Sequence, residues 1–133
     1  LAALKRFLAE EMTRHEHLVV LGDFNIAPED RDVWDPEAWG EAVLTSRAER
    51  AALRALLALG LVDVFRQFEQ EEKSFSWWDY RAAGFRRNLG LRIDLVLLSK
   101  ALAAGCMDAS IDRVPRGWER PSDHAPAIAT FKV

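Results

Sequence analysis

Apolar residues recur at helical spacing in two parts of the chain. Four of them fall on one face of a helix expected over residues 1–14. These four are Leu1, Leu4, Leu8 and Met12. A second helix is expected to begin after Ser46, because Ser46 and Glu49 have the identity and spacing of a capping box. Gly60 is a residue that commonly follows the last helical turn, so it marks the end of this second helix.

Shorter apolar runs between turn residues are typical of strands. The runs expected to form strands or extended segments are residues 17–21, 61–65, 75–78, 91–98, 110–114 and 125–131. A short helix is expected at residues 100–104, and a long loop over residues 25–45. Because strands are mixed with two or three helices, the pattern predicts an α/β or α+β layered fold in one domain over residues 1–133.

Composition limits the classes of protein that fit this fold. A length of 133 residues is enough for one modest domain. The net charge of -3 is no signature of nucleic-acid binding, so binding to DNA would require a local basic surface. The single cysteine, Cys106, excludes an internal disulfide and predicts a reducing compartment, the cytoplasm. No segment has the roughly 18 apolar residues of a membrane helix, so no membrane partner is expected.

Polar side chains follow the first apolar run directly. Asp23 comes after Gly22 at the end of that run, and the rim of a sheet is where sites of α/β proteins commonly form. Asn25 lies on the side of Asp23 if the chain stays extended. A carboxylate accepts a proton from water or binds a hard cation, and an amide donates to a phosphate oxygen. The alternative is an Asp-Phe-Asn turn closed by local hydrogen bonds.

A second carboxylate interrupts the longest apolar run. Asp94 lies in a segment that should be largely buried, and a buried carboxylate requires a partner. One candidate is a histidine, which Asp94 would orient and whose charged form it would stabilise. The other candidate is an arginine in a structural ion pair. Asp123 and His124 precede the last apolar run, where they either face one pocket, as a cation ligand and a phosphate contact, or form an ordinary polar turn.

Aromatic residues and arginines follow one another in the middle of the chain. Residues 75–81 contain four aromatics, and Arg86, Arg87 and Arg92 come after them. Aromatic rings stack on bases and arginines neutralise phosphates, so this segment is the expected local basic surface. The alternative is that alternate aromatics belong to the core while the arginines face solvent.

Four motifs together resemble the exonuclease III branch of the endonuclease/exonuclease/phosphatase superfamily, which comprises Mg²⁺-dependent abasic-site endonucleases. They are Gly22-Asp23-Phe24-Asn25, Ser76-Trp77-Trp78-Asp79-Tyr80-Arg81, Gly90-Leu91-Arg92-Ile93-Asp94 and Pro121-Ser122-Asp123-His124. The acidic and histidine motifs also occur in DNase I-like enzymes and inositol phosphatases, whereas the Trp-Trp and Leu-Arg-Ile stretches are more specific to the DNA-repair branch.

The resemblance implies a role for each residue of these motifs. Asp23 would activate the attacking water, and Asn25 would bind the scissile phosphate. Asp94 would orient His124, which would hold and polarise that phosphate. Asp123 and Asp23 are the implied ligands of Mg²⁺, with Mn²⁺ as an alternative. The implied DNA contacts are Trp77, Tyr80, Arg81, Asn88, Leu91, Arg92 and Ile93.

The resemblance also implies a substrate. Trp77, Leu91 and Ile93 fall where the family builds an apolar pocket for a flipped-out abasic sugar. The implied reaction is hydrolysis 5′ to an abasic site in double-stranded DNA, which leaves a 3′-hydroxyl. Removal of nucleotides from 3′ ends by 3′→5′ exodeoxyribonuclease activity is a second expected reaction.

The match covers the C-terminal half of a DNase I-like, four-layer α/β sandwich built from two similar halves. The N-terminal half, which would carry a metal-binding glutamate, is expected to be missing. An isolated half should expose apolar surface, and is therefore expected to form a homodimer or to bind the missing half. Two alternatives remain open. One is a phosphoesterase of the same superfamily acting on inositol phosphate or phospholipid, and the other is an inert fragment or DNA-binding module.

Overall fold

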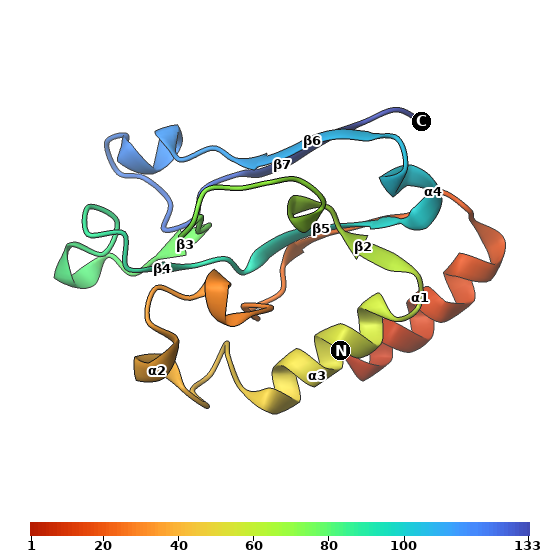
Figure 1. Ribbon diagram of the computed structural model, residues 1–133, viewed down its shortest axis with the longest axis horizontal. Coiled ribbons are helices and arrows are strands. Elements are labelled where there is room, and N and C mark those ends of the chain that lie inside the picture. Colours follow the sequence, from red (N-terminus) through yellow and green to blue (C-terminus); the bar gives the residue numbers. More distant parts are fainter.

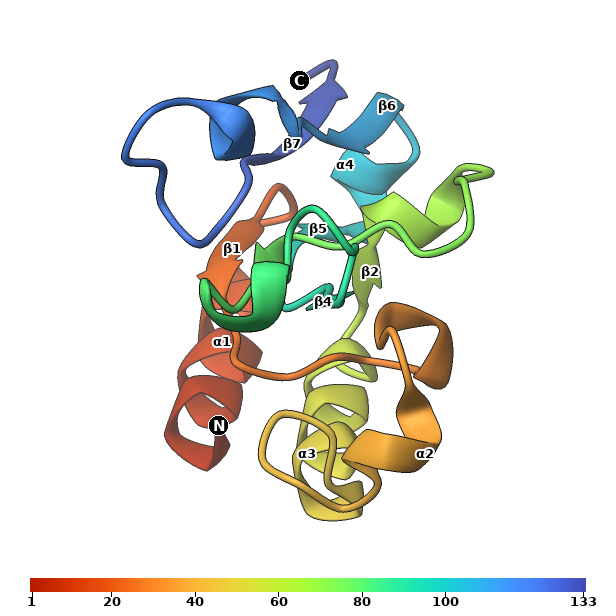
Figure 2. The same cartoon turned by 90° about the vertical axis from the view of Figure 1, so that its left-hand side faces the viewer.

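Two long helices lie against one face of a three-stranded sheet in the computed structural model, which describes residues 1–133 (Figures 1 and 2). The helices are α1 (Ala2–Arg14) and α3 (Arg47–Leu57). The sheet has the order β1 (Val19–Asp23), β5 (Asp94–Ser99) and β2 (Leu61–Asp63), with both pairs antiparallel. A two-stranded antiparallel sheet of β6 (Cys106–Ile111) and β7 (Ala127–Phe131) covers the other face.

The remaining elements are short and connect these layers. They are a third antiparallel pair, β3 (Trp77–Trp78) and β4 (Gly90–Leu91), the helices α2 (Pro36–Trp39) and α4 (Lys100–Ala103), and four 3₁₀ helices, η1 (Asp30–Asp32), η2 (Val64–Gln67), η3 (Arg81–Ala83) and η4 (Val114–Gly117). Helices pack against sheets in one layered arrangement, so the predicted mixed α/β class is confirmed. No helix combines the length and the apolar character needed to cross a membrane.

The alternation of side chains along β5 explains why both of its faces are covered. Leu95 and Leu97 point toward the helices, where they pack with Leu8 of α1 and Leu53 of α3. Leu98 points to the opposite face and packs against β6 and α4. A strand buried on both faces is uniformly apolar, which is why the sequence of β5 shows no alternation of apolar and polar residues.

The helix predicted after Ser46 is confirmed together with its cap. The Ser46 hydroxyl accepts the backbone N–H of Glu49 at 3.2 Å, and the Glu49 carboxylate accepts the backbone N–H of Ser46 at 3.2 Å. Each bond satisfies an N–H that the first turn of a helix leaves without a partner. The cap fixes the start of α3, whose Leu53 and Leu56 are buried against the main sheet.

The single strand expected over residues 91–98 is wrong, because the chain changes sheets in the middle of it. Gly90 and Leu91 pair with β3, whereas the segment from Asp94 pairs with β1 and β2. At the break, the backbone N–H groups of Ile93 and Asp94 both donate to the hydroxyl of Ser76, at 3.0 and 3.1 Å. A buried side chain thus replaces the strand partner that these two groups would otherwise need.

The bounds of several other strands also differ from the predicted ones. The structure has β1 at Val19–Asp23 rather than residues 17–21, β2 at Leu61–Asp63 rather than residues 61–65, and β3 at Trp77–Trp78 rather than residues 75–78. The strand expected over residues 110–114 begins and ends earlier, at Cys106 and Ile111, and Val114 belongs to η4 together with Pro115. A proline at the second position of a helical turn is compatible with the helix but removes a donor from a strand. The last strand begins at Ala127 rather than Ala125.

Candidate active site

The carboxylates of Asp23 and Asp94 come from the same end of the central sheet. Asp23 is the last residue of β1 and pairs directly with Asp94, the first residue of β5. Directly paired residues of an antiparallel sheet project from the same face. That face is the one covered by β6 and β7, so both carboxylates lie beside the segment that leads into β7.

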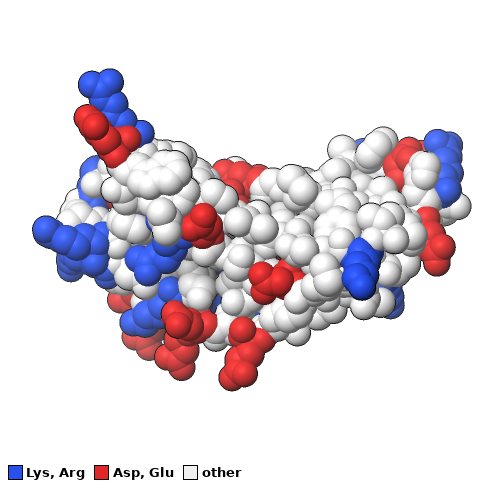
Figure 3. Space-filling model, turned by 90° about the horizontal axis from the view of Figure 1, so that it is seen from above, with Lys and Arg blue, Asp and Glu red and all other residues white.

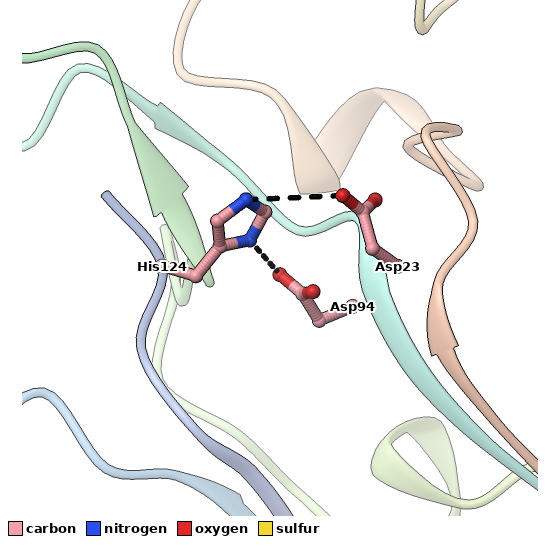
Figure 4. A group of neighbouring side chains, drawn as sticks. All are labelled: Asp23, Asp94 and His124. Carbon is pink, nitrogen blue, oxygen red and sulfur yellow. Dashed lines mark hydrogen bonds and ion pairs between the residues drawn. The ribbon is translucent and has the colours of Figure 1, made fainter. Parts of the chain in front are cut away.

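His124 lies against both carboxylates (Figure 4). Its Nδ1 donates to Oδ2 of Asp94 at 2.8 Å, which confirms the expected Asp-His pair. Its Nε2 lies 3.8 Å from Oδ2 of Asp23 and 3.8 Å from Oδ1 of Asp123. The alternative partner for Asp94, an arginine, is excluded by this geometry. The imidazole is therefore fixed at one nitrogen and directs the other toward two carboxylates.

These surroundings favour the charged form of the imidazole. Partial burial lowers the pKa of His124, but the hydrogen bond to Asp94 and the negative charges of Asp94, Asp123 and Asp23 outweigh it and raise that pKa above its ordinary value of 6.5. Burial raises the pKa of the Asp94 carboxyl, and the bond from His124 offsets part of that rise. The Asp94–His124 pair therefore favours the protonated imidazole, and a charged donor suits a contact to a phosphate oxygen.

Replacing Asp94 by asparagine is expected to lower the pKa of His124, because the change removes a hydrogen-bonded charge while the burial of the ring remains. NMR titration of the imidazole at several pH values measures this directly. A pKa raised in the folded state stabilises the protein below 6.5, and that contribution is lost as the pH rises through the raised pKa. An unchanged titration in Asp94→Asn would contradict the pairing.

Asn25 is placed by a turn rather than by an extended chain. Its backbone has a φ of 53°, in the left-handed region, and its N–H donates to Oδ1 of Asp23 at 2.9 Å. Asparagine tolerates this conformation better than most residues. The expectation of an extended segment is wrong here, and the Asp-Phe-Asn turn is the observed conformation. The turn leaves the Asn25 side chain exposed next to Asp23, where it is available to a ligand.

Asp123 is held by a tryptophan. The indole Nε1–H of Trp77 donates to Oδ2 of Asp123 at 3.0 Å, so one carboxylate oxygen is fixed while the other lies 3.8 Å from His124 Nε2. Trp77 and His124 are also joined by an isolated antiparallel bridge. The turn-like segment before β7 is therefore tied to β3, which places Asp123 beside Asp23 across the imidazole.

Ser76 positions the site, although the sequence motifs gave it no role. It is fully buried, and its hydroxyl accepts the N–H groups of Ile93 and Asp94. Its backbone carbonyl accepts the N–H of Ala125 at 2.8 Å. One residue thus connects the segment before Asp94 with the residue after His124. The only signal in the sequence is a small polar residue between Phe75 and Trp77, which does not reveal its partners.

Several of the expected DNA contacts are engaged inside the chain. Arg92 is buried, with its guanidinium bonded to Asp32 and Asp63, so its expected role as a DNA contact is wrong. The amide of Asn88 accepts from Trp78 Nε1 at 3.0 Å and donates to the carbonyl of Lys73 at 3.2 Å, so it connects loops. Carboxylates and carbonyls of the same chain thus bind the polar atoms of Arg92 and Asn88, so these two side chains stabilise the structure around the site.

The expected apolar pocket for a sugar is filled in this chain. Leu91 and Ile93 are 0% and 2% exposed, packed in a cluster with Ala27 and Val33. Trp77 is the only member of the expected set that reaches the surface. Other partly buried side chains cover the cluster, namely Trp34, Trp39 and Leu44. The loop expected over residues 25–45 therefore folds over the position where the pocket was predicted.

Tyr80 and Arg81 remain accessible. The Tyr80 hydroxyl donates to the carbonyl of Pro121 at 2.6 Å, and the residue is 60% exposed. The Arg81 side chain is 89% exposed and pairs with Asp79 at 2.7 Å. Arg86 and Arg87 are exposed in the same segment. Figure 3 shows Lys and Arg side chains gathered at the end of the molecule that carries this segment and η4, while the middle of that face is mainly uncharged.

Known proteins resemble this chain in sequence. The model of the endonuclease/exonuclease/phosphatase family matches residues 1–124. Exodeoxyribonuclease III of Haemophilus influenzae is 39% identical over 138 residues, which cover 98% of this chain and 52% of that protein. The chain thus spans about half the length of the curated relatives it matches.

Solved structures superpose on nearly the whole chain. The 3′-5′ exonuclease NExo from Neisseria meningitidis has a TM-score of 0.96 at 52% identity, covering 99% of this chain and 52% of that one. A second structure, with the same TM-score and identity, is of the Neisseria 3′ phosphatase NExo bound to a product DNA hairpin. An AP endonuclease from Archaeoglobus fulgidus has a TM-score of 0.92 at 37% identity, covering 98% and 51%. The chain belongs to the endonuclease/exonuclease/phosphatase family, within the branch of exodeoxyribonuclease III and the AP endonucleases.

Proposed function

We propose that this chain is the C-terminal half of a metal-dependent nuclease that hydrolyses phosphate esters of DNA. The observation that carries the proposal is the imidazole of His124, fixed by Asp94 at 2.8 Å and directed toward Asp23 and Asp123. A charged imidazole can donate to a phosphate oxygen, and a carboxylate beside it can activate a water for attack on that phosphate. The names of the relatives, which are DNA nucleases, support the same reaction.

Each side chain takes one step in this reaction. Asp23 accepts a proton from the attacking water, whose oxygen forms a bond to phosphorus. The charged imidazole of His124 and the amide of Asn25 donate to the phosphate oxygens, on which negative charge increases as the bond forms. The bond from phosphorus to the 3′ oxygen of the sugar breaks, and this oxygen takes a proton from solvent water to become the 3′-hydroxyl. Asp94 acts through His124, since it keeps the ring oriented and charged.

Asp23 and Asp123 fit a magnesium ion better than the other residues of the site do. Mg²⁺ prefers oxygen ligands, keeps several waters and commonly takes only one or two protein carboxylates. The Asp23 and Asp123 side chains are 37% and 40% exposed, whereas Asp94 and Nδ1 of His124 are bonded to each other. We therefore assign Mg²⁺, with Mn²⁺ as an alternative, to Asp23 and Asp123 together with a carboxylate of the missing half. The ion would offset the negative charge on the phosphate.

The missing half would cover an apolar face of the main sheet. Val19 and Leu21 of β1 are 39% and 66% exposed on the face that β6 and β7 cover only in part. A groove of about 370 Å³ runs along this face, from Leu21 and Val96 to His124 and Pro126. Exposed apolar side chains next to a groove indicate a surface that is covered in the complete protein. The groove ends at the site, so a bound half would also shield the Asp94–His124 pair from water.

The isolated chain is expected to show no saturable Mg²⁺ binding and no hydrolysis of DNA. It supplies only two carboxylates for the ion, and it lacks both the carboxylate of the missing half and the protein surface that would cover the site, so its affinity for Mg²⁺ should be weak. Isothermal titration with Mg²⁺ and a DNA cleavage assay check this, for the chain alone and for the complete enzyme, defined as this chain joined to the N-terminal half. Sedimentation analysis of the chain alone reports whether it forms a homodimer. Efficient cleavage by the chain alone, in either state, would contradict the proposed division of the site.

The complete enzyme is expected to act on DNA in preference to small phosphate esters. Two DNA substrates are proposed: duplexes with an abasic site, cut 5′ to the lesion, and duplexes whose 3′ end carries a phosphate or a nucleotide to be removed. The 52% identity to a protein described as a 3′-5′ exonuclease and a 3′ phosphatase supports the second substrate. The free thiol of Cys106 fits our assignment of this reaction to the reducing cytoplasm.

Rates with Mg²⁺ on an abasic duplex, a 3′-phosphate duplex and an inositol phosphate distinguish these substrates. Hydrolysis of either duplex with no release from the inositol phosphate is the expected result. A faster reaction on the inositol phosphate would favour the small-molecule alternative, and no reaction on any of the three would favour an inert fragment fold.

A further inference from the structure

A pocket lined by three tryptophans lies beside the candidate active site. Its volume is about 480 Å³, within the range of small-molecule sites. Trp34 and Trp39 come from the loop and short helix that precede α3, and Trp77 comes from β3. Asp79 and Arg81 lie at its rim. No residue of this pocket except Trp77 takes part in the site described above.

The pocket and the site share one indole. The ring of Trp77 lines the pocket, while its Nε1–H donates to Asp123 at 3.0 Å. The backbone of Trp77 is also bridged to His124. The indole of Trp77 therefore lies between a group inside the pocket and the Asp123 carboxylate of the site, so the pocket and the site can hold neighbouring parts of one ligand.

The lining selects an aromatic ligand. Trp34, Trp39 and Trp77 are each partly exposed, so their rings offer flat apolar surface to a ligand. Stacking of a base on an aromatic side chain is tolerant of sequence, because every base has a π face. A bare deoxyribose has no such face, and its hydroxyl groups would lose their hydrogen bonds to water on entering an apolar pocket.

The charges at the rim favour a base over a phosphate inside the pocket. Arg81 bonds to Asp79 at 2.7 Å, and this bond lowers the pKa of Asp79 to about 2, so the two charges cancel near neutral pH. A neutral rim offers no net attraction to an anion inside. Arg86 and Arg87, exposed in the segment that continues from the rim, are placed to meet the backbone phosphates outside.

We propose that this pocket receives the nucleobase of an unpaired nucleotide at a DNA 3′ end, so that the enzyme prefers ends bearing a base to ends with a bare sugar. The proposal rests on the proposed function, since it places the base next to the phosphate that is hydrolysed. It differs from the sugar pocket implied by the sequence, whose members Leu91 and Ile93 are buried beneath the same tryptophans.

The test uses the complete enzyme with the Asp23→Asn change, which keeps the DNA uncut. A duplex with an unpaired 2-aminopurine at its 3′ end is titrated with protein, since stacking quenches the fluorescence of this base. Binding is expected to quench the fluorescence, and Trp39→Ala is expected to remove the quenching and to weaken binding of this end about 5- to 100-fold. Trp39→Phe, which keeps an aromatic face, should restore most of both. A duplex with an abasic 3′ end should bind equally to all variants.

The matched control is Trp118→Ala, since Trp118 is a 64% exposed tryptophan outside the pocket. It should leave the quenching unchanged. Absence of quenching in the parent protein, or equal weakening of both ends by Trp39→Ala, would overturn the pocket assignment. Failure of the proposed function looks different, because an enzyme with an intact Asp23 would then hydrolyse neither end.

Discussion

Asp23→Asn and His124→Ala in the complete enzyme are each expected to lower turnover by about 10²–10⁴-fold. An amide in place of the Asp23 carboxylate would no longer accept a proton from water. Without the imidazole, the phosphate would lose the one cation that the chain itself supplies at the site, with its charge maintained by Asp94 at 2.8 Å. Removing a donor that acts on developing charge affects the transition state more than the bound substrate, so turnover should fall more than substrate affinity.

Single-turnover cleavage of an abasic or 3′-phosphate duplex measures the chemical step in these variants. Neither change should unfold the protein, since both side chains are partly exposed at the rim of the sheet. Asp108→Asn and His17→Ala are matched controls, because both residues are exposed and lie outside the cluster around His124. Near-normal cleavage by Asp23→Asn or His124→Ala would contradict the assignment of the site.

Asp32→Ala is expected to destabilise the complete enzyme by about 3–5 kcal/mol, the usual cost of leaving a buried charge without its partner. Asp32 is fully buried and accepts from Nε of Arg92 at 2.7 Å and from Arg66. Arg92 also donates two bonds to Asp63, at 3.0 and 2.6 Å. Burial lowers the pKa of Arg92, but the two carboxylates raise it above its ordinary value. Removing Asp32 leaves the buried Arg92 with only the partly buried Asp63 carboxylate and takes away the partner of Arg66.

Chemical denaturation monitored by tryptophan fluorescence gives the free energy of unfolding for this comparison. Asp30→Ala is the matched control. Asp30 lies two positions away in the same 3₁₀ helix, but its side chain is 75% exposed in its pair with Arg50, so its loss should cost about 1 kcal/mol or less. Equal destabilisation by the two substitutions would show that the buried network contributes nothing beyond a surface ion pair.

Much of the candidate site was predictable because its signals are local. Gly22-Asp23 follows an apolar run and Asp23 ends β1, while Asp123-His124 precedes another apolar run and lies just before β7. The capping box at Ser46 is equally local, and it was confirmed to the residue. The partner of Asp94 was narrowed to a histidine or an arginine, and the structure identifies it as His124, 30 residues further along the chain.

The predictions that were wrong depended on contacts between residues far apart in the chain. Arg92 looked like a phosphate contact, because an arginine beside aromatics is the same in sequence whether it meets DNA or a buried carboxylate. Asp32 lies 60 residues away, so no local pattern could reveal the pair. Leu91 and Ile93 looked like the wall of an open pocket, since nothing in the spacing showed that Trp34 and Trp39 would fold over them.

Apolar periodicity and short motifs are local signals, so the family, the layered α/β fold and the residues that meet at the site could be obtained from the amino-acid order alone, although exact strand bounds could not. Which polar side chains remain free for DNA could not, because it depends on long-range packing. Arg92 is unavailable for a contact with DNA because its guanidinium forms ion pairs with Asp32 and Asp63. Apolar surfaces follow the same rule, because the burial of each side chain is a property of the whole packed chain.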